Sequence, residues 1–254
     1  MRAVSTTLAY RDFYYPLNVF MHILTHEEGD VPYLHYGLFE SDEETLPVAQ
    51  ERSTELLLAR LPSPPARLLE VGIGLGTTLD RLTRLGYDVT GITPDDKQIA
   101  VVRDRYADRV RAECIAFEQF VSPERFDMVL FQESSQYIEA RALFAKAAEL
   151  TSKVFVLDEF AMRPIGVLHR YDDFLAAAEQ HGFRLTEEID VSAKVPASID
   201  YFMTRFPRYR ERLVSDLGIS SQQIDELIES GREYRKLYES GAYGYRLLQF
   251  ARTA

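Results

Sequence analysis

The sequence predicts an α/β fold in which helices cover both faces of a mostly parallel sheet. From residue 66 onwards, short apolar segments alternate with segments of helical periodicity, the order typical of parallel strands joined by crossover helices. The chain has 254 residues, of which 46% are hydrophobic, so it can bury a sizeable core. In such a sheet a ligand binds beyond the carboxyl ends of the strands, and the loops at that edge are the first places to search for a site.

Each element follows from the spacing of its apolar residues and from the residue that ends it. Helical spacing predicts a helix over 44–61, which Pro62 ends. A short apolar run at 66–73 predicts the first strand, and the helix expected over 77–86 ends at Gly86. The other strands are expected at 87–92, 110–116, 125–132, 153–160, 184–192 and 242–252, and the other helices at 95–106, 139–151 and 171–183.

Two helix starts carry recognisable capping residues. Thr93 is expected to cap the helix at 95–106, with Pro94 at the first helical position, where a missing N–H costs no hydrogen bond. Ser220 and Gln223 have the spacing of a capping box and predict a second helix start near the C-terminal end of the chain.

These elements predict three regions. Residues 1–61 form an N-terminal helical cap segment, and residues 62–194 together with 242–254 form the α/β domain. Residues 195–241 are helical throughout and are expected to be a lid inserted before the last strand. No Gly/Ser linker separates this lid from the sheet, so we expect the two to pack together. Specificity is expected to lie in the lid and in residues 10–40.

Composition excludes several classes of function. A net charge of −11 disfavours a general nucleic-acid surface, which needs concentrated Lys and Arg. The first twenty residues contain no continuous apolar stretch, and no run approaches the ~18 residues that span a bilayer. Cys114 is the only cysteine, which fits a reducing compartment, and it is expected to be a small core residue. We therefore expect a cytoplasmic protein with no membrane span, for which a homodimer is one expected assembly.

Three glycines at alternate positions, Gly72, Gly74 and Gly76, follow the first predicted strand. A phosphate-binding P-loop is excluded because no Lys follows the last glycine. A dinucleotide loop is disfavoured because Thr77 stands where its third glycine belongs, and its side chain would crowd a pyrophosphate. An ordinary tight turn with Glu70 as a buried polar residue stays open.

The segment Glu70-Val-Gly-Ile-Gly-Leu-Gly76 resembles motif I of the class I S-adenosylmethionine-dependent methyltransferases, and residues 66–160 follow that family's order of elements. The resemblance implies a Rossmann-like sheet of seven strands, the last one antiparallel, and S-adenosylmethionine as cofactor. It also implies that the glycines lie under the methionine part of the cofactor. The Glu70 carboxylate can complement the cofactor's ammonium group.

The stretch at 89–99 differs from most of that family, because Thr93 replaces the acid that usually holds both ribose hydroxyls. It instead resembles the branch of cyclopropane-fatty-acid synthases and of sterol and tocopherol methyltransferases. By that resemblance Thr93 and Gln98 face the ribose, with Asp95 helping; helix capping alone is the alternative for Thr93 and Asp95. After the third strand, Phe117 is expected to pack on adenine and Glu118 to read its edge, unless Glu118 is a solvated cap.

The same branch has counterparts to Phe131-Gln-Glu-Ser134 and to His35-Tyr36-Gly37. The resemblance places Gln132 beside the methionine part of the cofactor and Glu133 near the sulfonium and the methyl acceptor. It makes Tyr36 a wall of the cofactor pocket, with a plain core tyrosine as the alternative.

Glu133 is the first candidate for a catalytic base or for a carboxylate that stabilises a developing cation. His35, Glu159 and His169 are further candidates, the two histidines because histidine titrates near neutral pH. No metal site is predicted from the scattered histidines and the single cysteine. The basic stretch from Arg205 to Arg212 is interpreted as a solvated helix face or as the site of an anionic substrate group.

The predicted function is methylation of a small-molecule acceptor by S-adenosylmethionine, with carbon of a lipid, isoprenoid or natural product as one target. O- or N-methylation of a small metabolite is the first alternative. Two further alternatives stay open, because one scaffold hosts many functions. One is an enzyme that binds the cofactor but carries out other chemistry, such as cyclisation; the other is a catalytically silent binding subunit.

Overall fold

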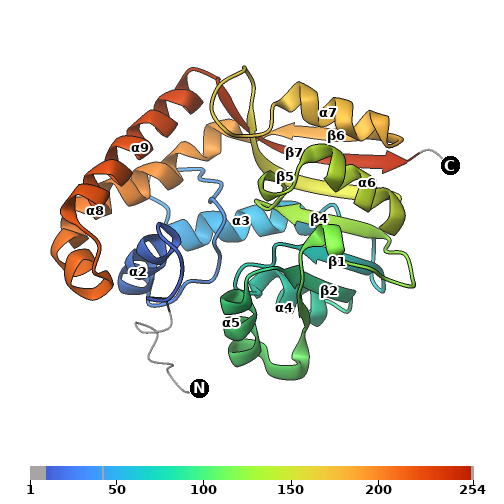
Figure 1. Cartoon of the computed structure of the whole chain (residues 1–254), viewed down its shortest axis with the longest axis horizontal. Helices are drawn as coiled ribbons and strands as arrows, with labels where there is room; N and C mark the ends of the chain where they lie inside the picture. Colours follow the sequence, from blue (N-terminus) through green and yellow to red (C-terminus); the bar gives the residue numbers. More distant parts are fainter. Residues whose placement is uncertain (1–9, 42, 253–254) are drawn as a thin grey trace.

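A computed structural model describes residues 10–41 and 43–252 of the chain. Its centre is one seven-stranded sheet with the strand order β3-β2-β1-β4-β5-β7-β6 (Figure 1). The first five strands run parallel, and β7 pairs antiparallel with both β5 and β6. The predicted fold class, including its antiparallel last strand, is confirmed.

The strands lie close to their predicted positions. Their bounds are β1 Arg67–Val71, β2 Asp88–Thr93, β3 Arg111–Cys114, β4 Met128–Gln132, β5 Lys153–Ala161, β6 Phe183–Asp190 and β7 Tyr243–Arg252. The central strands β1, β4 and β5 are almost wholly buried, which explains their mostly apolar sequence.

Helices cover both faces of the sheet. Those on one face are α3 Leu46–Leu58, α4 Thr77–Arg84 and α5 Asp96–Tyr106; those on the other are α6 Ala140–Leu150 and α7 Tyr171–Gln180. The remaining helices are α2 Leu17–Glu28, α8 Pro196–Leu217 and α9 Ser221–Glu239. Among the described residues, none of the helices has the length and apolar character needed to cross a membrane.

The helices α2, α8 and α9 share a hydrophobic core of their own beside the sheet (Figure 1). Leu24 of α2, Leu213 of α8 and Ile224 of α9 are among its buried members. The N-terminal segment and the predicted lid therefore pack on each other as well as on the sheet. We call α2, α8 and α9 together the cap.

Two local predictions need correction, and one is confirmed. Cys114 is exposed, because β3 is an edge strand whose residues are mostly accessible. Asp95, not Thr93, is the N-cap of α5: its side chain accepts from the backbone N–H groups of Lys97 and Gln98, which lie one turn inside the helix. The capping box at the start of α9 is confirmed.

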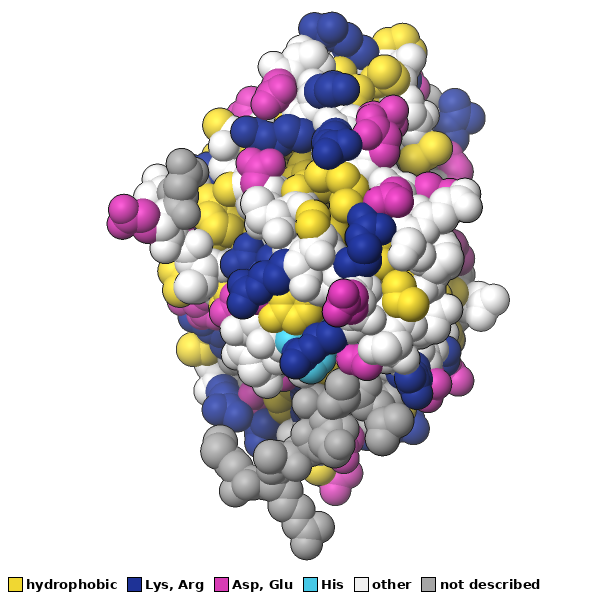
Figure 2. Space-filling view, turned by 90° about the vertical axis from the view of Figure 1, so that its left-hand side faces the viewer, with side chains coloured by type: hydrophobic (Ala, Val, Ile, Leu, Met, Phe, Trp, Pro, Cys, Tyr) yellow, Lys and Arg dark blue, Asp and Glu magenta, His cyan; other side chains and the backbone are white. Residues whose placement is uncertain are grey.

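The basic stretch lies in α8 and is occupied by contacts within the cap. Arg205 pairs with Glu27 of α2 at 3.0 Å and stacks on the ring of Tyr201. Arg210 pairs with Asp225 of α9. On this side of the molecule, basic and acidic side chains alternate over the surface (Figure 2). The arrangement favours the interpretation of a solvated helix face.

Candidate functional site

A cavity of about 490 Å³ lies beyond the carboxyl ends of β1, β2 and β4. It occurs where the strand order reverses between β1 and β4, the place expected for a ligand in a doubly wound sheet. The sequence-predicted residues that line this first cavity are His35, Glu70, Gly72, Gly74, Thr93, Gln98, Phe117, Glu118, Gln132 and Glu133. Residues far apart in the sequence are thus brought to one cavity.

The glycine loop combines a left-handed backbone with close packing. Gly72 has φ +76°, and a Cβ placed on it would lie 2.3 Å from Cβ of Ser134. Gly76 does not line the cavity; a Cβ there would meet Val102 and Tyr106 of α5 at about 3 Å. Gly76 therefore serves the packing of the loop on α5, while Gly72 and Gly74 form the cavity floor.

Glu70 is a buried carboxylic acid at the edge of this floor, with 5% of its surface exposed. Among the described residues, nothing forms a hydrogen bond to its Oε2 atom. Burial raises the pKa of Glu70 to about 8. An unpaired buried carboxyl group is costly, and it suits a ligand that brings its own ammonium donor.

We expect Glu70→Gln to remove a pH-dependent loss of stability. The pKa of Glu70 is raised in the folded state, so its contribution to stability is complete below the unfolded pKa, about 4.3, and is lost as pH rises through 8. Thermal unfolding without ligand should show Tm of the wild type falling from pH 5 to 8 relative to the variant. Glu179→Gln, at an exposed position, is the control. If Tm depended on pH in the same way in both variants, the raised pKa assigned to Glu70 would be contradicted.

Thr93 and Gln98 form one hydrogen-bonded unit on the β2 side of the cavity. The Thr93 hydroxyl donates to Oε1 of Gln98 at 2.9 Å and accepts from the backbone N–H of Asp95. Thr93 thus holds both the start of α5 and the Gln98 amide. On the far side, Phe117 is buried edge-to-face against Phe131, with ring centroids 5.2 Å apart.

Glu133 lies directly after β4 and has φ +51°, a strained conformation for a residue other than glycine. Its Oε1 atom accepts two short hydrogen bonds, from the Tyr36 backbone N–H and from the Tyr245 hydroxyl, each at 2.6 Å. The side chain opens on the cavity but is otherwise enclosed by protein. Burial, with the charge of Glu159 second, raises the pKa of Glu133 well above its usual value.

A second cavity of about 430 Å³ lies between the first one and the cap, and Glu133 lines both. Its walls are largely aromatic and aliphatic side chains of α2, α8 and α9. Glu159 is its second acid, accepting from the Tyr238 hydroxyl at 2.7 Å, and burial raises its pKa to about 7. Tyr36 lines this second cavity, not the first.

The two predicted histidines are placed differently. His35 lines both cavities, but burial lowers its pKa to about 4, and the ring lies 2.9 Å from the Tyr36 carbonyl. It is therefore a weak base that positions the backbone next to Glu133. His169 lines neither cavity; its Nε2 atom lies 3.1 and 2.9 Å from the carbonyls of Ser135 and Ile138.

Sequence reasoning missed Tyr245 as a partner in this site, whereas Glu159 was among the candidate bases. Tyr245 lies 112 residues from Glu133 and reaches it only because β7 inserts beside β5. In the sequence it is one more aromatic residue of an apolar strand. Glu159 lies within β5 and lines the second cavity, not the first.

Comparison with known proteins agrees with this geometry. Residues 69–153 match the family described as a methyltransferase domain. An O-methyltransferase of Penicillium expansum is 28% identical over 231 residues, which cover 79% of this chain and 82% of that protein. A ubiquinone biosynthesis O-methyltransferase of Rhodopseudomonas palustris is 31% identical over 46% of this chain, and the match spans 57% of that relative's length.

Solved structures of the same fold include enzymes named for different reactions. A cyclopropane synthase of Mycobacterium tuberculosis has a TM-score of 0.77 with 16% identity, covering 96% of this chain and 93% of that one. A 4+2 cyclase has a TM-score of 0.76 with 19% identity, covering 91% and 92%. At these identities the likeness shows the fold alone.

The family resemblance drawn from the glycine loop is thus confirmed by the matched domain, the sheet order and the curated relatives. The chain therefore contains a methyltransferase domain of the kind that uses S-adenosylmethionine as cofactor.

Proposed function

We propose that the protein transfers a methyl group to a small, largely apolar acceptor bound in the second cavity, with Glu133 as the base or cation-stabilising carboxylate. The observation that carries this proposal is that Glu133 lines both cavities. The glycine loop lines the first cavity, and side chains of the cap line the second. A group at their junction can contact both reactants.

The first cavity fits S-adenosylmethionine, which supplies an electrophilic methyl group on a sulfonium. Glu70 has an unpaired buried oxygen for the ammonium group, and the cavity side of Gly74 carries no side chain. Gln98 and Thr93 offer polar groups on the ribose side. Phe117 and Glu118 line the same cavity, and on this proposal they contact adenine.

Glu133 is held in a way that suits proton transfer. The Tyr36 N–H and the Tyr245 hydroxyl both donate to Oε1 of Glu133. Oε2 is therefore the oxygen that can face a methyl acceptor. The raised pKa favours a neutral carboxyl group in the empty site. A positive charge brought into either cavity lowers that pKa and leaves a carboxylate, which can accept an acceptor's proton or stabilise a carbocation.

The walls of the second cavity favour an apolar acceptor and fit methylation at carbon. The aromatic side chains of Phe20, Phe202 and Tyr234 line the same cavity as the two acids Glu133 and Glu159. Aromatic faces stabilise a developing positive charge. The second candidate is O-methylation, favoured by the curated relatives that are O-methyltransferases; Glu133 would then take the hydroxyl proton.

The direct test uses S-adenosylmethionine with a deuterated methyl group and a panel of apolar acceptors that carry alkene, enol, phenol or amine groups. Mass spectrometry should find one labelled methyl group per product, and NMR should locate it on carbon or oxygen. A rearranged acceptor of unchanged mass would replace the proposal by cofactor-bound cyclisation. Tight cofactor binding with no product from any acceptor would favour a silent binding subunit.

Narrowing the second cavity should impair acceptor binding alone. Gly231 of α9 lines this cavity, and the atoms nearest to a Cβ placed there belong to the flexible side chain of Met203, whose sulfur would lie 2.2 Å away. We expect Gly231→Leu to raise KM for the acceptor by about tenfold, since the added side chain fills the cavity. Calorimetry should show unchanged affinity for S-adenosylhomocysteine. An equal loss of both affinities would contradict the assignment of the two cavities.

The cytoplasmic location and the homodimer are sequence-based predictions that we retain as part of this proposal. Cell fractionation and light scattering of the purified protein are their direct measurements.

A further inference from the structure

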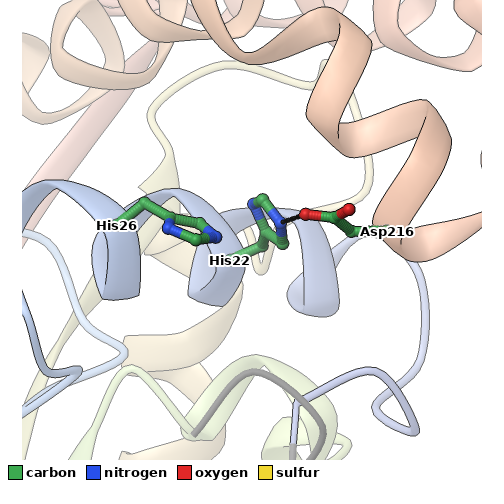
Figure 3. A group of neighbouring side chains, drawn as sticks. All are labelled: His22, His26 and Asp216. Carbon is green, nitrogen blue, oxygen red and sulfur yellow. Dashed lines mark hydrogen bonds and ion pairs between the residues drawn. The ribbon is translucent and has the colours of Figure 1, made fainter.

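Three side chains with metal-binding atoms meet between α2 and α8, away from the two cavities (Figure 3). His22 and His26 are one helical turn apart on α2 and project from the same side of that helix. Asp216 comes from the C-terminal end of α8 and points at His22 (Figure 3). No metal site is predicted from the scattered histidines, yet residues 22–26 read His-Ile-Leu-Thr-His, a spacing that brings two imidazoles to one side of a helix.

The geometry is that of a nearly formed ligand set. Nε2 of His22 lies 2.9 Å from Oδ2 of Asp216, and the candidate ligand atoms of the three residues all lie within 4.8 Å of one another. The side chain of His22 is 2% exposed. Among the described residues, nothing forms a hydrogen bond to the buried Nε2 atom of His26. A buried nitrogen without a partner is the second observation that points to a missing ligand.

We propose that His22, His26 and Asp216 bind a divalent transition-metal ion of the zinc class and thereby join α2 to α8. Two imidazoles and one carboxylate suit such an ion, with a water molecule as the fourth ligand. Bonds of about 2.0–2.2 Å draw tetrahedral ligand atoms to roughly 3.4 Å apart. Small rotations of the half-buried His26 and Asp216 side chains accomplish this.

Charged and polar neighbours of the three ligands affect the affinity of this site for a metal ion. Arg212 is the unfavourable one: its Nη1 atom lies 3.5 Å from Nδ1 of His26. It is exposed and can turn to solvent, whereas the proposed ligand atom is the opposite nitrogen, Nε2. Ser215 donates to Oδ1 of Asp216 at 2.8 Å and so orients the carboxylate. Without metal, the contact between His22 and Asp216 links the same two helices by a single hydrogen-bonded pair.

A metal here would stiffen the walls of the second cavity. Phe20, Met21 and Leu24 of α2 line that cavity, as do Phe202 and Phe206 of α8. The ion would lie on the side of α2 that faces the C-terminal half of α8 and would fix the two helices to each other. This site does not depend on which reaction the cavities support.

The test is calorimetric titration of tag-free, EDTA-treated full-length protein with zinc chloride, followed by cobalt absorption spectroscopy. We expect one equivalent bound with a dissociation constant below about 10 µM. His26→Gln and Asp216→Asn should each weaken binding at least tenfold, because each removes a ligand. His181→Gln, a histidine on another helix end, should leave the affinity unchanged.

The variant Arg212→Gln provides a second test, whose expected result cannot arise from loss of folding. Removing its positive charge should tighten zinc binding several-fold, because the repulsion between two cations falls. Thermal unfolding of the wild type should shift to higher Tm with zinc, and that of His26→Gln should not. Absence of binding in the wild type, or zinc affinity that survives His26→Gln, would overturn the proposal. These readouts need no methyl acceptor, so they stand apart from the test of methyl transfer.

Discussion

Replacing Glu133 by glutamine is expected to lower turnover by a factor of about 10²–10⁴, the usual contribution of a positioned acid–base group. The amide keeps an oxygen that can accept from the Tyr36 N–H and the Tyr245 hydroxyl, so the loop should keep its shape. It cannot take up a proton or carry a negative charge. The measurement is kcat with the acceptor identified from the panel, alongside calorimetric affinity for S-adenosylhomocysteine, which should stay within about threefold.

The exposed Glu179→Gln on α7 is the matched control and should retain full turnover. Tyr245→Phe removes one hydrogen bond that favours the carboxylate of Glu133, so the pKa of Glu133 should rise further. The acid limb of the pH profile of kcat should then move to higher pH. Unchanged turnover in Glu133→Gln would show that the acceptor needs neither a base nor a nearby carboxylate at this position.

Gly72→Ala is expected to lose cofactor binding and a large part of the protein's stability. At φ +76° a side chain is strained, and the new Cβ would lie 2.3 Å from Cβ of Ser134. Ser134 cannot retreat freely, since its hydroxyl donates to the Val71 carbonyl at 2.6 Å. We expect the free energy of unfolding to fall by about 2–4 kcal/mol, from backbone strain plus overpacking. Affinity for S-adenosylhomocysteine should fall more than tenfold.

Gly218→Ala separates these two causes. Gly218 ends α8 at φ +69°, but a Cβ there meets nothing within 4 Å. Only the backbone cost of about 1–2 kcal/mol should appear, with cofactor affinity unchanged. Urea denaturation and calorimetry measure both quantities. Equal effects of the two substitutions would show that strain alone, and not the contact with Ser134, makes glycine necessary in the loop.

The sheet could be predicted because its information is local. The strand before Gly72 is mostly apolar, and its burial on both faces favours that composition. The exposure of Cys114 could not be predicted, since an apolar neighbour pattern does not say that a strand lies at an edge.

The candidate site also has a part that the sequence predicts and a part that depends on contacts between distant segments. Glu133 was found because the order of elements places the loop after β4 at the ligand-binding edge. Its partner Tyr245 was not, because that contact depends on the position of β7 in the sheet. The placement of His169 outside both cavities depends likewise on how the loop after β5 folds back. Contacts between distant segments are the part that periodicity does not encode.

The hydrogen bond from the Tyr36 backbone to Glu133 ties acid–base chemistry to access. Tyr36 belongs to the segment between α2 and α3, which also walls the second cavity. Were that segment to move outward, Glu133 would lose a donor and its affinity for a proton would increase. With the segment in place, the hydrogen bond favours the carboxylate form. Closure would therefore act as an interlock, in which the group that assists the reaction is ready only while the reactants are enclosed.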